Sequence, residues 1–108
     1  MSLIRICADE HGETHFEDLT FPQELTSAPA DEVSLRYQTA GRLMDWHTVS
    51  KRMYFVTLSG EAEITVSDGE TRRVGPGNVT LCEDLTGKGH RTRVAGAEPR
   101  LCLAVTLP

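Results

Sequence analysis

The chain has 108 residues, of which 39% are hydrophobic and 25% are charged, so its length and composition are typical of one globular domain and leave no room for two. The formal net charge is −5, with 16 acidic against 11 basic residues, and this balance argues against a nucleic-acid-binding surface. The N-terminal apolar stretch is too short for a signal peptide, and no apolar run approaches the ~18–20 residues of a membrane span. We therefore expect a cytoplasmic protein with no membrane partner, in which the three cysteines, none in a C-x-x-C pair, are reduced thiols.

Residues 1–32 differ in pattern from the rest of the chain. They are acidic, contain Pro22 and Pro29, and show little hydrophobic periodicity. One short strand is expected near residues 12–18. This pattern predicts an irregular N-terminal arm that packs on the domain formed by residues 33–108.

From residue 33 the hydrophobic pattern has a period of two, which is the pattern of half-buried strands. Val33, Leu35 and Tyr37 alternate with polar residues, and we expect these three side chains to face the interior. Further strands are predicted over residues 52–58, 61–67, 71–74, 78–82, 90–94 and 101–107. Asp68-Gly69 is the strongest hairpin signal, and no segment after residue 30 is typical of a helix. Residues 33–108 are therefore predicted to form an all-β barrel or sandwich.

The order of motifs resembles that of the cupin family, whose first motif begins G-x5-H and whose second motif contains G-x2-H. Gly41 to His47 matches the opening of the first motif, and the spacing from Met53 to Gly60 matches its end. Gly77 with Asn78 matches the start of the second motif, and Gly87-Lys88-Gly89-His90 matches its histidine. The loop Asp84 to His90 is similar to one found in a subset of small, largely uncharacterised cupins. The resemblance implies a double-stranded β-helix (jelly-roll) barrel with its function in the interior.

The resemblance also implies a degenerate metal site. Cupins that bind metal use two histidines and a glutamate of the first motif and the histidine of the second. Here Val49 and Met53 replace the second histidine and the glutamate, so only His47 and His90 remain. Because a divalent ion takes four to six ligands, a bound Zn, Fe, Ni, Mn or Cu ion would need replacement ligands. The thioether of Met53 is one possibility, and side chains of Asp84 or His15 are others.

We expect a cavity with an apolar lining and a few polar groups, as is normal for small-molecule sites. Its expected lining residues are Tyr37, Trp46, His47, Met53, Phe55, Asp84 and His90. The alternative for the two histidines is that they are hydrogen-bonded interior residues, and for Met53 and Trp46 it is ordinary packing. Asp84 has two possible roles. It acts on the site, by orienting a site group or exchanging a proton with it, or it caps its own loop. Lys88 either steers an anionic ligand at the barrel mouth or has no role.

The sequence is compatible with three functions. The favoured one is a small-molecule binding module that performs no reaction. The second is a metal-dependent enzyme, dioxygenase-like or isomerase-like, that uses His47 and His90 with replacement ligands. The third is a structural protein with a filled interior. A chain of this size has a thin stability margin, so we also expect a homodimer.

Overall fold

The computed structural model describes all residues from Met1 to Pro108. It contains β-strands and no helix, and hence no membrane-spanning helix. The strands are, in chain order, β1 (Ser2–Ala8), β2 (Thr14–Leu19), β3 (Glu32–Gln38), β4 (Leu43–His47), β5 (Met53–Ser59), β6 (Glu61–Val66), β7 (Thr71–Val74), β8 (Asn78–Cys82), β9 (His90–Ala95) and β10 (Arg100–Thr106). This architecture confirms the predicted all-β class.

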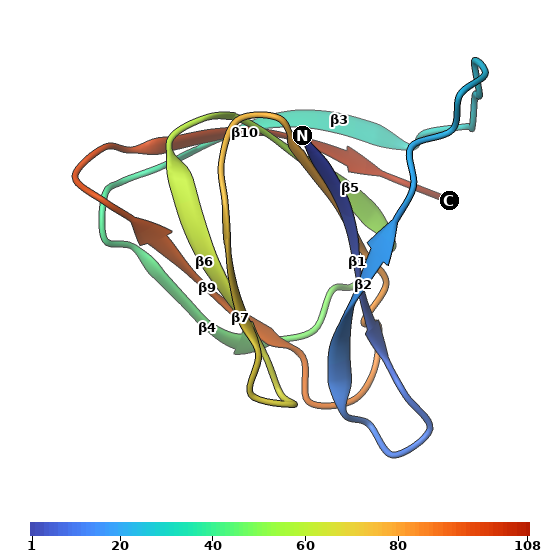
Figure 1. Cartoon of the computed structure of the whole chain (residues 1–108), viewed down its shortest axis with the longest axis horizontal. Coiled ribbons are helices and arrows are strands. Elements are labelled where there is room, and N and C mark those ends of the chain that lie inside the picture. The colour runs from blue at the N-terminus through green and yellow to red at the C-terminus, as the bar shows by residue number, and fades with distance from the viewer.

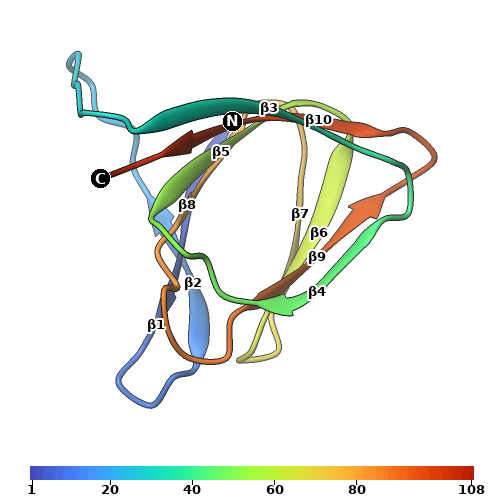
Figure 2. The same cartoon turned by 180° about the vertical axis from the view of Figure 1, so that it is seen from behind.

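The strands form two sheets that curve around a common interior (Figures 1 and 2). The six-stranded sheet has the order β2-β1-β8-β5-β10-β3, and the four-stranded sheet has the order β4-β9-β6-β7. Neighbouring strands run antiparallel, except that β1 and β8 run parallel. The turn at Asp68-Gly69 joins β6 to β7, as its sequence predicts.

The N-terminal segment is more regular than its sequence pattern predicts. A strand occurs near residues 12–18, as expected, but residues 2–8 also form a strand, which lies between β2 and β8. Ile4 and Ile6 of this strand are almost fully buried and belong to the barrel core. Residues 20–31 have no regular structure, and they project from the body of the barrel (Figures 1 and 2).

A single buried cluster fills much of the space between the sheets. Its members are Ile4, Ile6, Val49, Met53, Ala62, Ile64, Val66, Val74, Cys82 and Ala104. Phe16 and Phe55 pack against this cluster from its border. Full burial of one such Ile or Val side chain stabilises the fold by roughly 1.5–3 kcal/mol. Because its members come from both sheets, this core holds the two sheets together.

Strand β3 corrects one expectation from the sequence. Its alternation is present, but Val33, Leu35 and Tyr37 are 62%, 68% and 66% exposed and lie on the outer face. The polar residues of the strand face inward, and Gln38 is buried. Arg36 and Gln38 line the interior space, whereas Val33, Leu35 and Tyr37 continue an apolar outer surface on β10. Tyr37 therefore does not line the interior.

Candidate functional site

The interior contains an open cleft of about 620 Å³ that adjoins a smaller inner chamber of about 70 Å³. We call these two spaces together the hollow. Four residues line both spaces and so connect them: Arg36, His47, Phe55 and His90. The rim of the cleft is polar, and the chamber is lined by a mixture of apolar residues with Gln38, Thr80, Thr92 and Arg100. A concave space of this kind is the usual form of a small-molecule site.

His47 and His90 lie side by side on neighbouring strands of the four-stranded sheet. They are register partners of β4 and β9, and their ring centroids are 4.5 Å apart with an interplanar angle of 56°. Gly89 makes this approach possible, because it has a φ of +75° and a Cβ there would overlap the carbonyl oxygen of His47. The glycine-containing loop that the sequence singles out therefore serves to bring the two imidazoles together.

Asp84 orients His90 from the buried side. Asp84 is fully buried, and its Oδ2 lies 2.6 Å from Nδ1 of His90, whose side chain is 5% exposed. In the neutral imidazole this contact makes Nδ1 the protonated donor and leaves Nε2 free to accept a hydrogen bond or a proton. Of the two roles that the sequence allows for Asp84, the side chain adopts the orienting one. The pair can hold a polar ligand group or exchange a proton with it.

The residues present do not fit a resident transition metal. No group of three His, Cys, Asp or Glu side chains lies close enough to share an ion, so His47 and His90 have no third protein ligand. Met53 is 8% exposed and packs in the apolar core. The expected replacement ligand His15 lies instead between Asp9 and Asp68. The arrangement is that of two imidazoles facing a hollow, and we assign no step to a metal.

Two arginines complete the wall of the hollow. Arg100 is 4% exposed, and it donates to Thr57 Oγ1 at 3.0 Å and to Gln38 Oε1 at 3.4 Å. Its Nε has no hydrogen-bond partner, and no carboxylate forms an ion pair with it. Burial lowers the pKa of the Arg100 guanidinium from its ordinary value, but a guanidinium remains charged in proteins. Arg36 lines both spaces, and its guanidinium carbon lies 5.3 Å from the centre of the Phe55 ring.

Of the other expected lining residues, two face the interior and one faces solvent. Phe55 lines both spaces, and Met53 lines the outer cleft. Trp46 is 45% exposed beneath Arg91, because it neighbours His47 in β4 and the period of two places it on the opposite face. The sequence pattern did not identify Arg36 and Arg100 as lining residues, since charged residues in strands usually indicate a solvated face. The available signal was that Arg36 and Gln38 alternate with the apolar residues of β3.

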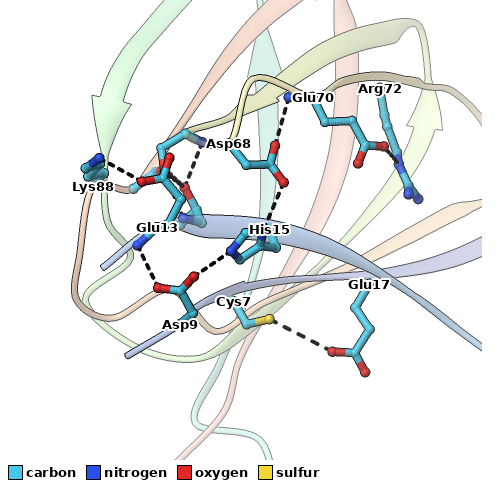
Figure 3. Close-up of polar contacts among 12 residues, drawn as sticks. Cys7, Asp9, Glu13, His15, Glu17, Asp68, Glu70, Arg72 and Lys88 are labelled. Atoms are coloured by element: carbon cyan, nitrogen blue, oxygen red, sulfur yellow. Dashed lines mark hydrogen bonds and ion pairs between the residues drawn. The ribbon is translucent and has the colours of Figure 1, made fainter. Parts of the chain in front are cut away.

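The loop before His90 is fastened to the β1–β2 hairpin outside the hollow (Figure 3). Lys88 Nζ lies 2.7 Å from Glu13 Oε2, so this lysine pairs with an acid and does not line the hollow. In the same region His15 lies 2.7 Å from Asp9 and 2.9 Å from Asp68 (Figure 3). The hydrogen bonds that His15 donates to Asp9 first and to Asp68 second raise the pKa of His15. We call this exterior group of ion pairs the clasp.

Comparison with known proteins supports the architecture and goes no further. No protein-family model and no curated protein matches the chain. A cupin superfamily protein from Desulfitobacterium hafniense is 23% identical with a TM-score of 0.57, over 77% of this chain and 72% of that one. A Cupin 2 conserved barrel domain protein from Salinispora arenicola is 24% identical with a TM-score of 0.60, over 82% and 71%. The cupin domain of Cnp3 from Schizosaccharomyces pombe is 18% identical with a TM-score of 0.58, over 88% and 73%. At these identities the similarity concerns the fold alone.

Proposed function

Because this chain is a small protein with the cupin fold, we propose that it binds a small molecule in the hollow between its two sheets. The feature that supports this function best is the continuity of the cleft and the chamber through Arg36, His47, Phe55 and His90. The histidines offer polar contacts, and Phe55 offers an apolar wall. A ligand entering from the cleft would meet all of them.

A metal-dependent dioxygenase or isomerase is the less supported alternative. Such a site would need at least one more protein ligand beside His47 and His90, and the positions available are filled by Val49 and Met53. Asp84 already holds His90. We therefore propose binding without a resident metal.

Ligand screening by two-dimensional NMR tests the proposed binding. A fragment library with neutral, anionic and cationic members is added to ¹⁵N-labelled protein, and the shifted amides are mapped. We expect shifts at residues lining the hollow and weaker binding in His47→Ala. The matched control is His11→Ala, because His11 has an 82% exposed side chain on the β1–β2 turn outside the hollow. Binding confined to other surfaces, or no binding by any class of fragment, would contradict the proposal.

We also propose that the chain forms a homodimer through the outer face of β3, β10 and β5. Val33, Leu35 and Tyr37 stand opposite Val105, Leu103 and Leu101 in the strand register, and Val56 and Tyr54 continue the row on β5. At about two-thirds exposure, the three β3 side chains alone present on the order of 300 Å² of apolar surface. Their partly exposed neighbours on β10 and β5 enlarge this apolar surface.

A second copy of the chain is the occupant that this outer apolar face fits. It contains no charged side chain, so two copies of it meet without the repulsion expected elsewhere from a net charge of −5. β3 is also a free edge strand. A two-fold axis through this face would pack the apolar rows of the two copies against each other, which is a self-complementary arrangement.

Light scattering coupled to size-exclusion chromatography tests the dimer. We expect a dimer for the unmodified chain and a monomer for Leu35→Glu. Leu43→Glu is the matched control, because Leu43 is 49% exposed on β4, the edge strand of the other sheet. A monomeric unmodified chain, or a Leu35→Glu variant that remains dimeric, would overturn this interface.

The compartment that we propose is the cytoplasm. Cys7, Cys82 and Cys102 are all free thiols, and burial strongly raises the pKa of Cys82, which keeps this thiol unreactive. Unpaired cysteines are typical of a reducing compartment.

A further inference from the structure

The basic side chains of this protein fall into two groups. Outside the inner chamber, most of them form ion pairs with carboxylates: Arg5, Lys51, Arg52, Arg72, Arg73, Lys88 and Arg93. Arg36 and Arg100, which line the inner chamber, form none, although acids outnumber bases in the chain. Acidic residues Asp31 and Glu32 line the cleft, but no carboxylate lines the inner chamber, so the two chamber arginines have no acidic partner in its wall.

Arg100 is the most unusual member of this pair. Its guanidinium has five N–H donors, and Thr57 Oγ1 and Gln38 Oε1 are its only side-chain acceptors. Nε is buried without a partner. Both acceptors are neutral, so the buried charge has no compensating anion, and such a group costs several kcal/mol of desolvation. Neutral packing would serve the fold better at this position.

We propose that the hollow is an anion site, and that its ligand is a small carboxylic acid whose carboxylate lies against Arg100 and Arg36. This inference rests on the proposed binding function and names its ligand class. The carboxylate supplies the missing counter-ion, and guanidinium groups bind carboxylates through paired, charge-assisted hydrogen bonds.

The chamber favours a carboxylate over inorganic phosphate for two reasons. Five of its twelve lining residues are hydrophobic, including Ile6, Met44 and Ile64, so an ion with a short apolar chain fits it better than a fully polar ion. Its volume of about 70 Å³ also favours a compact head group. The remainder of the ligand extends past His47, Phe55 and His90 into the cleft, where Asp84 holds His90 with Nε2 free to contact it.

Titration calorimetry with propionate tests the ligand class. Propionate is added at constant ionic strength, and its neutral isostere propionamide and inorganic phosphate are added in parallel experiments. We expect propionate to bind at least about tenfold more tightly than propionamide, since only the anion forms charge-assisted hydrogen bonds with the guanidinium groups. Arg100→Met and Arg36→Met should each weaken propionate binding by about tenfold or more and leave propionamide unaffected.

Arg42→Met is the matched control, because Arg42 is an exposed surface arginine outside both spaces. Arg36 is also exposed, so its variant reports on the site even if the Arg100 variant does not fold. Equal binding of propionate and propionamide would overturn the carboxylate assignment and leave the proposed binding function standing, whereas failure of all fragments to bind in the hollow would overturn both. The carboxylate assignment would also be overturned if phosphate bound more tightly than propionate, or if Arg42→Met had an effect as large as that of Arg100→Met.

Discussion

Charged side chains are paired on the outside of the barrel, whereas Arg100 in its hollow is not. At the clasp, Lys88 pairs with Glu13, and His15 lies between Asp9 and Asp68. Within the hollow, Arg100 is buried and has only neutral partners. Exposed ion pairs contribute little to stability because water screens them, whereas an unpaired buried charge is costly. The ion pairs of the clasp therefore need no ligand to account for them, whereas Arg100 is the residue for which we propose one.

The largest expected effect comes from the buried pair of Asp84 and His90, in which Oδ2 of Asp84 is bonded to His90 and Oδ1 has no partner. Asp84→Ala removes the acceptor of the buried His90 Nδ1, and an unsatisfied buried donor costs about 1–3 kcal/mol. We expect a loss of this size in the free energy of unfolding, measured with urea. Asp84→Asn keeps an acceptor at the same place and should lose less. Equal stability of Asp84→Ala and the unmodified protein would show that the interior pair does not hold His90.

Arg100→Met separates stability from binding. Replacing an unpaired buried charge by an apolar side chain of similar volume should leave the unfolding free energy unchanged or raise it by about 1–2 kcal/mol. Propionate binding should fall at the same time. Urea unfolding of the ligand-free protein measures the first effect. A loss of several kcal/mol would make Arg100 a structural residue and would remove the contrast between the hollow and the exterior.

The exposed ion pair of Arg73 and Glu61 should affect stability slightly and propionate binding not at all. Arg73 is paired with Glu61 across β6 and β7, with side chains 55% and 46% exposed. Arg73→Ala should lower the unfolding free energy by roughly 0–1 kcal/mol. Propionate affinity, measured by calorimetry on the same sample, should not change. A change in affinity as large as that of Arg100→Met would mean that overall charge, and not a defined site, attracts the ligand.

The smallest effect is the pH dependence of the clasp. Asp9 and then Asp68 raise the pKa of His15 above its ordinary value of 6.5. His15 therefore contributes stability that is fully present below pH 6.5 and is lost as the pH rises through the raised pKa. Asp9 and Asp68, whose own pKa values are lowered, lose their contribution only in acid below their ordinary value of 3.8.

The midpoint of thermal unfolding measures this dependence. The difference between the unmodified protein and His15→Gln should shrink as the pH increases above 6.5, and propionate binding should be the same in both. A difference that grows with pH would contradict the assigned direction.

The sequence predicted the fold more successfully than the site. Period-two alternation and the Asp68-Gly69 turn identified most strands, and the resemblance to cupins placed His47 and His90 near each other. β3 was assigned the wrong face, because alternation shows that a strand has two faces but not which of them is inside. Arg100 was missed because its burial depends on Gln38 and Thr57, which come from other strands. Contacts between distant segments are not visible in a local pattern.

A crystal structure of the protein grown with 3-bromopropionate is the most direct test of the anion site. Anomalous scattering from bromine locates the apolar end of the ligand, and the density locates its carboxylate. The account predicts the carboxylate against Arg100 and Arg36, with the bromine among the apolar residues of the chamber or beside Phe55. A ligand bound at Lys88, at the outer apolar face or elsewhere on the surface, with the hollow containing only water, would contradict it.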